Sequence, residues 1–116
     1  MLIQYAETLP PLPKWLQEKR LAMDPVPECM SPVFLHGEKQ PDGGIAFYFD
    51  IPPEAPTVRG LASILYHGLN GARPDEILSV PMDFYQQMNL QEAISYQRLR
   101  GFMGLLAHMK QAALNN

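Results

Sequence analysis

The sequence predicts an α+β fold in which a small antiparallel β-sheet packs against several helices. Two segments, residues 33–36 and 45–50, have the apolar and aromatic content of strands, and a glycine-rich segment between them suits a hairpin turn. The second half of the chain shows the helical spacing of apolar residues. Helices gathered around a compact sheet define the α+β class, and the central hairpin leaves room for a third strand. At 116 residues the chain is long enough for one such domain, residues 1–116.

Composition and charge narrow the classes of function. Hydrophobic residues make up 47% of the chain and charged residues 18%, which fits a folded globular protein and argues against a disordered one. The net charge of −3 gives no general attraction to phosphate backbones, so we expect no nucleic-acid partner. No apolar run approaches the roughly 20 residues of a membrane helix, so we expect no membrane association. The first residues show no secretory signal pattern, which together with a single cysteine predicts a cytoplasmic or equally reducing location.

The N-terminal part of the chain is expected to form two short helices joined by a proline-rich strap. Apolar residues within residues 2–9 have helical spacing, and the prolines that follow end the pattern. Residues 9–13 then predict an extended strap over the core. A second short helix through Leu21 would use Trp15 and Leu16 as anchors. The same prolines are compatible with a polyproline ligand, although such ligands usually lie in disordered tails.

An antiparallel hairpin is the expected centre of the sheet. Residues 33–36 and 45–50 would pair across a loop over residues 37–44, in which Asp42-Gly43-Gly44 supplies residues that tolerate positive φ. Apolar side chains alternate with more polar ones along the second strand, which predicts one core face and one wetter face. The core-facing side chains are then Ile45, Phe47 and Phe49.

Four helices are expected after the sheet. Thr57 is expected to cap the first of them, which would end at Asn70-Gly71. Pro74 suits the first turn of the second helix, and residues 81–88 predict a further short one. Ser95 is expected to cap the last and longest helix. Its apolar stripe is predicted to contain Tyr96, Leu99, Met103, Leu106, Met109 and Ala113.

The stretch of residues 26–36 contains the only cysteine of the chain, Cys29. Prolines around the cysteine keep its approach out of a helix, and residues 30–35 have the apolar character of a strand. We therefore expect Cys29 at the mouth of a strand, where its side chain is presented rather than packed. Two interpretations stay open from these residues: an inert core thiol, which is a common state of free cysteine, or the reactive atom of the protein.

Several motifs follow one another along most of the chain, and in this order they resemble the SufE family of sulfur-acceptor proteins. These proteins work with cysteine desulfurases in iron–sulfur cluster assembly. The motifs are Leu9-Pro10-Pro11-Leu12-Pro13, Val26-Pro27-Glu28-Cys29-Met30-Ser31-Pro32-Val33-Phe34, Val58-Arg59-Gly60-Leu61, Gly71-Ala72-Arg73-Pro74 and Arg98-Leu99-Arg100-Gly101.

The resemblance implies that Cys29 accepts sulfane sulfur as a persulfide and passes it to an iron–sulfur scaffold. The implied partner is a cysteine desulfurase of the SufS type, a pyridoxal phosphate enzyme that this chain would stimulate while holding no cofactor or metal itself. Arg59 and Arg98 match basic positions of the family and are candidates to stabilise the thiolate or its loop. Arg59 is also compatible with an exposed ion pair, and Arg98 with holding loop carbonyls.

Two departures from the family pattern favour an alternative, a SufE-shaped module that binds a desulfurase or another partner without transferring sulfur. Glu28 stands where the family has glycine, and residues 51–54 replace its usual acidic segment. If the family glycine serves a positive φ, Glu28 imposes either strain or a different loop path. Its carboxylate also disfavours a neighbouring thiolate.

The remaining candidate residues are expected to be structural. The three histidines, which lack the spacing of metal ligands, are His36, His67 and His108. Gly101 and Gly104 suit close packing of the last helix against a neighbour. A cysteine hydrolase, a third class of function, would need a histidine within hydrogen-bond reach of the thiol.

Overall fold

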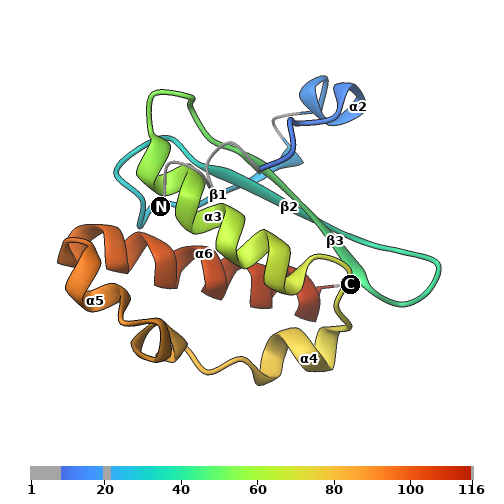
Figure 1. The fold of residues 1–116 in the computed structure, drawn as a ribbon. Helices are drawn as coiled ribbons and strands as arrows, with labels where there is room; N and C mark the ends of the chain where they lie inside the picture. Colours follow the sequence, from blue (N-terminus) through green and yellow to red (C-terminus); the bar gives the residue numbers. More distant parts are fainter. Residues whose placement is uncertain (1–8, 20–21, 116) are drawn as a thin grey trace.

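The computed structural model describes residues 9–19 and 22–115 (Figure 1). Apart from Leu9, the helix expected over residues 2–9 lies outside this described part. A short helix α2, Lys14–Gln17, occupies part of the second expected helix, whose last residues also lie outside it. Leu16 is the buried anchor of α2, whereas the Trp15 side chain is 43% exposed. The Trp15 ring packs edge-on against Tyr48, on the wetter face of the sheet.

The sheet has three antiparallel strands among the described residues, in the order β1-β2-β3. Their bounds are Asp24–Pro25 for β1, Phe34–Lys39 for β2 and Ile45–Asp50 for β3. The predicted hairpin is thus confirmed, and β1 supplies the third strand. The alternation of burial along β3 is confirmed as well, because every second side chain from Ile45 to Phe49 is buried.

The first hairpin strand is longer than the sequence predicts. The sequence places residues 37–39 in the turn, but in the structure they continue β2, and Gly37 pairs with Phe47. A Cβ atom on Gly37 would lie only 2.8 Å from the Cβ of Ala112 on the last helix. This glycine therefore marks the close approach of a helix to the sheet and not a bend of the chain. The turn itself is shorter and has Gly43 at a φ of 90°.

Helix α3, Pro56–Leu69, follows the sheet, and it begins without the cap expected at Thr57. Ala55 precedes the helix and makes no side-chain capping bond. Pro56 explains the start, because proline at the first helical position has its φ already fixed and lacks the N–H that would need a cap. The predicted end is confirmed: the helix stops at Leu69, and Gly71 has a φ of 84°.

The rest of the chain forms a layer around the long final helix. Helix α4 spans Pro74–Ser79, the 3-10 helix η2 spans Phe84–Met88, α5 spans Leu90–Ala93, and α6 spans Tyr96–Leu114. The predicted cap of α6 is confirmed, since the Ser95 hydroxyl accepts the Arg98 N–H at 3.3 Å. The segment expected as a helix over residues 81–88 becomes helical only from residue 84 and as a 3-10 turn.

Helix α6 is the centre of the fold. It contacts β2 and α3 on one side and α4 and α5 on the other, and Figure 1 shows α4 and α5 on the side of α6 away from the sheet. Two faces of the helix are buried for this reason. Its predicted stripe is confirmed except at Tyr96, which is 72% exposed at the end of the helix. Large, fully buried side chains of the core include Leu35, Phe47, Leu61, Phe102, Leu105 and Met109. Within the described residues, no helix combines the length and the apolar character needed to cross a membrane.

Candidate functional site

The single cysteine lies on a closed loop between β1 and β2. The loop is pinned at its base, because the Val26 N–H donates to the Val33 carbonyl oxygen at 2.9 Å and both valine side chains are buried. Inside the loop the Cys29 N–H donates to the Val26 carbonyl oxygen at 3.2 Å. The thiol therefore sits at the tip of a short turn whose two ends are held in the core.

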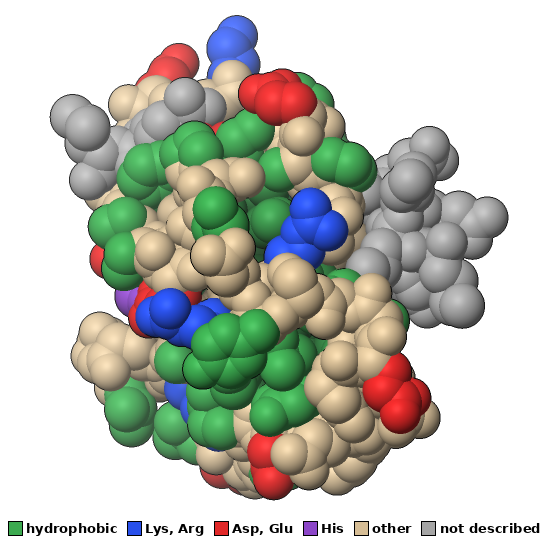
Figure 2. All heavy atoms as spheres, turned by 90° about the vertical axis from the view of Figure 1, so that its left-hand side faces the viewer, with side chains coloured by type: hydrophobic (Ala, Val, Ile, Leu, Met, Phe, Trp, Pro, Cys, Tyr) green, Lys and Arg blue, Asp and Glu red, His purple; other side chains and the backbone are tan. Residues whose placement is uncertain are grey.

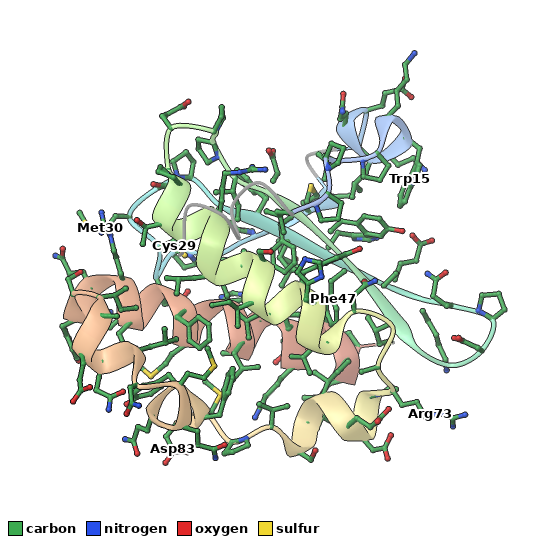
Figure 3. The ribbon with its side chains drawn as sticks, viewed as in Figure 1. Trp15, Cys29, Met30, Phe47, Arg73 and Asp83 are labelled. Atoms are coloured by element: carbon green, nitrogen blue, oxygen red, sulfur yellow. The ribbon has the colours of Figure 1, made fainter. Side chains whose placement is uncertain are left out.

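This loop replaces the first half of the strand expected over residues 30–35. That strand begins only at Phe34, since Pro32 has no N–H to offer to a ladder and Met30 is 78% exposed. Cys29 lies within the loop, so its expected place at the mouth of a strand is wrong. Figure 3 shows Cys29 between α3 and α6, with Met30 at the outer edge of the molecule.

Two glycines of α6 make room for the cysteine loop. The Cys29 thiol donates to the carbonyl oxygen of Gly101 at 3.7 Å. A Cβ atom on Gly101 would lie 3.2 Å from Cys29 Sγ, and one on Gly104 would lie 2.7 Å from the Cβ of Glu28. Any larger side chain at these positions would push against the loop. The close packing expected of both glycines is confirmed, and the neighbour is the cysteine loop itself.

Glu28 reaches along α6 and pairs with a histidine. Its Oε1 lies 3.2 Å from Nε2 of His108, and because an ionised carboxylate can only accept, the imidazole is the donor. The left-handed φ considered for Glu28 is not found. Among the described residues other than glycine, only Asn89 has a positive φ. The loop path accommodates Glu28 without backbone strain.

The Cys29 thiol is protonated in this arrangement. Burial first, and the negative charge of Glu28 second, raise the pKa of Cys29 from its ordinary value of 9.0 to about 11. The thiolate, and not the thiol, is the nucleophile in exchange reactions. With the partly buried thiol packed against α6, little of the reactive thiolate is therefore present near neutral pH.

A cavity of about 280 Å³ opens beside the thiol. Its apolar lining comes mainly from α3 and α6, and two exposed, oppositely charged side chains, Glu54 and Arg98, also line it. Figure 2 shows the face at this end of the molecule, where hydrophobic side chains gather and acidic side chains lie mainly toward the edges. Apolar lining residues include Val58, Leu61, Phe102 and Leu105.

The structure separates the two arginines of the predicted site. Arg98 and Cys29 line the same cavity. Arg59 instead donates from Nη1 to the carbonyl oxygen of Ile51 at 2.8 Å, and so holds the segment that leads from β3 into α3. The loop-holding role considered for Arg98 is thus performed by Arg59, on a different loop.

Sequence reasoning missed the part that His108 plays. Gly101, Gly104 and His108 are spaced three and four residues apart, so they lie on one face of α6, and this spacing could have been noticed. His36 instead stacks with Tyr48, near the Trp15 ring. Within the part of the chain that the structure describes, no group of three or more histidine, cysteine or acidic residues is placed to hold a metal ion.

Fold and site together define a small α+β domain with one sheltered thiol on a loop packed against its longest helix. The chain belongs to the SufE family, because residues 1–113 match the family model described as an Fe–S metabolism associated domain. Membership assigns the protein a general role in iron–sulfur metabolism.

Similar proteins agree with the assignment to this family. An uncharacterized SufE-like protein of Mycobacterium tuberculosis H37Rv is 46% identical over 111 residues, which cover 96% of this chain and 76% of the relative. One from Synechocystis is 30% identical over 97% of this chain and 67% of its own. The solution structure of a hypothetical protein from Thermus thermophilus has 35% identity and a TM-score of 0.83, and the match covers 99% of this chain and 82% of that one.

Proposed function

We propose that this chain is a sulfur acceptor. It docks on a cysteine desulfurase of the SufS type, takes sulfane sulfur on Cys29 as a persulfide, and delivers it to an iron–sulfur scaffold. The unit that acts is one domain of residues 1–116, working in a reducing compartment such as the cytoplasm. The observation that carries the proposal is a lone thiol on a pinned loop, packed beside a cavity of about 280 Å³ at one end of the molecule.

Sulfur transfer at Cys29 is a thiol exchange. The Cys29 thiol first loses its proton, and the thiolate attacks the terminal sulfur of the donor persulfide. A new S–S bond forms on Cys29 while the S–S bond of the donor breaks, and the donor cysteine leaves as a thiolate. No net oxidation occurs and no cofactor of this chain is needed. Pyridoxal phosphate belongs to the desulfurase.

The raised pKa of Cys29 favours a mechanism in which the loop moves before the thiol reacts. In the packed position, burial and the charge of Glu28 raise that pKa to about 11, so little thiolate exists near neutral pH. Moving the tip of the loop away from α6 removes the larger cause, which is burial. The packed position would then protect the persulfide from stray thiols between uptake and delivery.

The two arginines have different proposed roles. Arg98 lines the cavity beside Cys29 and is exposed, so it is available to stabilise a thiolate that forms there. Arg59 stabilises the neighbouring connection through its bond to Ile51. We therefore propose Arg98 as a contributor to sulfur uptake and Arg59 as a structural support.

Intact mass spectrometry tests the proposal. The protein is incubated with a cysteine desulfurase and free cysteine, and it is expected to gain the mass of one sulfur atom, reversibly with a reducing agent. Cys29→Ser is the matched control and is expected to gain nothing. The proposal fails if Cys29 gains no sulfur while an established acceptor, run in parallel with the same desulfurase, does.

A second function is favoured by the chemistry of the loop. This function is that of a SufE-shaped module that binds a desulfurase or another partner without transferring sulfur. A thiol with a pKa of about 11 next to Glu28 is a poor nucleophile near neutral pH, and a module that only binds its partner does not need a reactive thiol. Cys29→Ser separates the two functions. A binding module keeps its full effect on the rate of the desulfurase after this substitution, whereas a sulfur acceptor loses its stimulation.

A further inference from the structure

Glu28 and His108 join the cysteine loop to α6 through a side-chain contact. Glu28 Oε1 and His108 Nε2 are 3.2 Å apart, and the side chains are 36% and 28% exposed, respectively. The contact links residues 80 positions apart in the sequence. Partial burial makes such a charge-assisted bond stronger than a pair on an open surface.

The rest of the Glu28 side chain also lies on the helix. A Cβ atom placed on Gly104 would lie 2.7 Å from Cβ of Glu28 and 3.0 Å from both Cγ and Cδ. The side chain thus crosses the helix backbone at Gly104, and its carboxylate reaches His108 one turn further on. The same glutamate, directly next to Cys29, therefore packs over Gly104 and contacts His108.

The thiol itself holds the loop less firmly. Its bond to the Gly101 carbonyl oxygen is 3.7 Å long and has a weak S–H donor. The backbone N–H of Cys29 donates to Val26, so that bond stays inside the loop. Among these contacts, the bond between Glu28 and His108 is the strongest that connects the tip of the loop to α6.

We propose that Glu28 and His108 form a tether that holds the cysteine loop closed against α6 and thereby sets how readily Cys29 leaves its shelter. The proposal rests on the sulfur-acceptor function only for its biological meaning, because the tether itself is a property of the isolated protein. Both are positioning residues: they act on the reacting atom through the loop. The partner for which the loop opens is the one proposed above.

Breaking the tether is expected to raise the population of the open loop about three- to tenfold, which is the effect of losing one partly shielded hydrogen bond. His108→Ala removes the donor and leaves the charge of Glu28 in place. Glu28→Ala removes the acceptor together with the methylene groups over Gly104. Glu28→Gln is the conservative variant, since its amide oxygen still accepts from His108 and its methylene groups still cover the glycine.

The test measures hydrogen–deuterium exchange of residues 26–31 and the rate at which iodoacetamide alkylates Cys29, on the full chain alone. His108→Ala and Glu28→Ala are each expected to raise exchange about three- to tenfold. The hydrogen–deuterium exchange of Glu28→Gln is expected to stay within about twofold of the exchange of the unaltered protein. The double variant with both Glu28→Ala and His108→Ala is expected to match Glu28→Ala, because without the glutamate His108 has no bond to the loop left to lose. His67→Ala, on α3, is the matched histidine control.

Two results would overturn the tether. One is unchanged exchange in His108→Ala, and the other is a double variant whose effect is the product of the single effects. Exchange is independent of thiolate content, so it separates loop opening from the charge effect of Glu28 on the thiol. Because no desulfurase is present, failure here leaves the mass measurement of sulfur uptake unaffected, and a chain that gains no sulfur can still show the tether.

Discussion

Replacing Glu28 by glutamine separates the two causes that make Cys29 a weak acid. The pKa of the thiol is raised from 9.0 to about 11, first by burial and second by the charge of Glu28. Near neutral pH this corresponds to about a hundredfold less thiolate than an ordinary cysteine has. Glutamine has nearly the same shape and can accept the same hydrogen bond, so the substitution removes the charge and leaves the burial.

The pKa of Cys29 is expected to fall in Glu28→Gln, because loss of a nearby negative charge makes the thiolate easier to form. Burial is the larger cause, so the pKa stays in the upper half of the interval between 9.0 and about 11. The rate of thiol alkylation at neutral pH should therefore rise, but by less than about tenfold.

The assay follows the rate of iodoacetamide alkylation of Cys29 from neutral to alkaline pH. Because the chain has one cysteine, the mass gain that is absent from Cys29→Ser reports on this residue alone. Glu92→Gln on α5 is the matched control for charge and should leave the profile unchanged. An unchanged profile in Glu28→Gln refutes the charge effect. A pKa that falls into the lower half of the interval between 9.0 and about 11 refutes burial as the larger cause.

Three further comparisons are expected to separate the roles of these residues: one between two glycines, one between two arginines, and one between the unaltered protein and Cys29→Ser. Gly104→Ala should destabilise the protein by about 1–3 kcal/mol through collision with the cysteine loop, whereas Gly68→Ala on α3, with open space around it, should stabilise by about 0.5–1 kcal/mol. Arg59→Ala should lower the free energy of unfolding by about 1 kcal/mol without changing sulfur uptake, and Arg98→Ala should slow sulfur uptake without changing stability. Against Cys29→Ser, the unaltered protein should lose stability as the pH rises from 9.0 toward 11, since the unfolded chain releases the thiol proton first.

Thermal and urea unfolding measure the stability changes, and intact mass measures sulfur uptake. Equal effects of the two glycine substitutions would contradict the packing of the loop on α6. Slower sulfur uptake in Arg59→Ala, together with lower stability in Arg98→Ala, would contradict the different roles of the two side chains. A stability difference between the unaltered protein and Cys29→Ser that is constant with pH would show that the thiol pKa is the same in the folded and unfolded states.

The sequence indicated those elements whose signals are local. Two such signals are Ser95 before one apolar helix and Asn70-Gly71 after another. Both predicted helix ends are confirmed, because capping involves only neighbouring residues. The prediction of the turn was wrong at Gly37, because this glycine is needed for the close approach of Ala112 on α6 and that contact lies far along the chain. Thr57 failed as a cap because Pro56 already provided a helix start.

The candidate site likewise combines features that local sequence signals predict with contacts between distant residues that they do not predict. Cys29 could be singled out as the only thiol in a proline-flanked stretch, and the order of motifs pointed to its family. The contact between Glu28 and His108 spans most of the chain, so no local pattern reveals it. The different positions of Arg59 and Arg98 likewise depend on how α3 and α6 pack, which spacing within either helix does not determine.

The pinned base of the cysteine loop limits how far the thiol can travel. Val26 and Val33 are buried and bonded to each other, and Cys29 follows Val26 by only three positions. A fully extended chain covers about 10 Å over that length, so the Cys29 backbone can swing no further than this from its anchor. In the proposed sulfur transfer, the donor sulfur is therefore expected to reach the protein surface beside α6 on a segment of the partner that projects toward the loop. If Cys29 accepts sulfur as proposed, the partner must cover most of the distance between the two sulfur atoms.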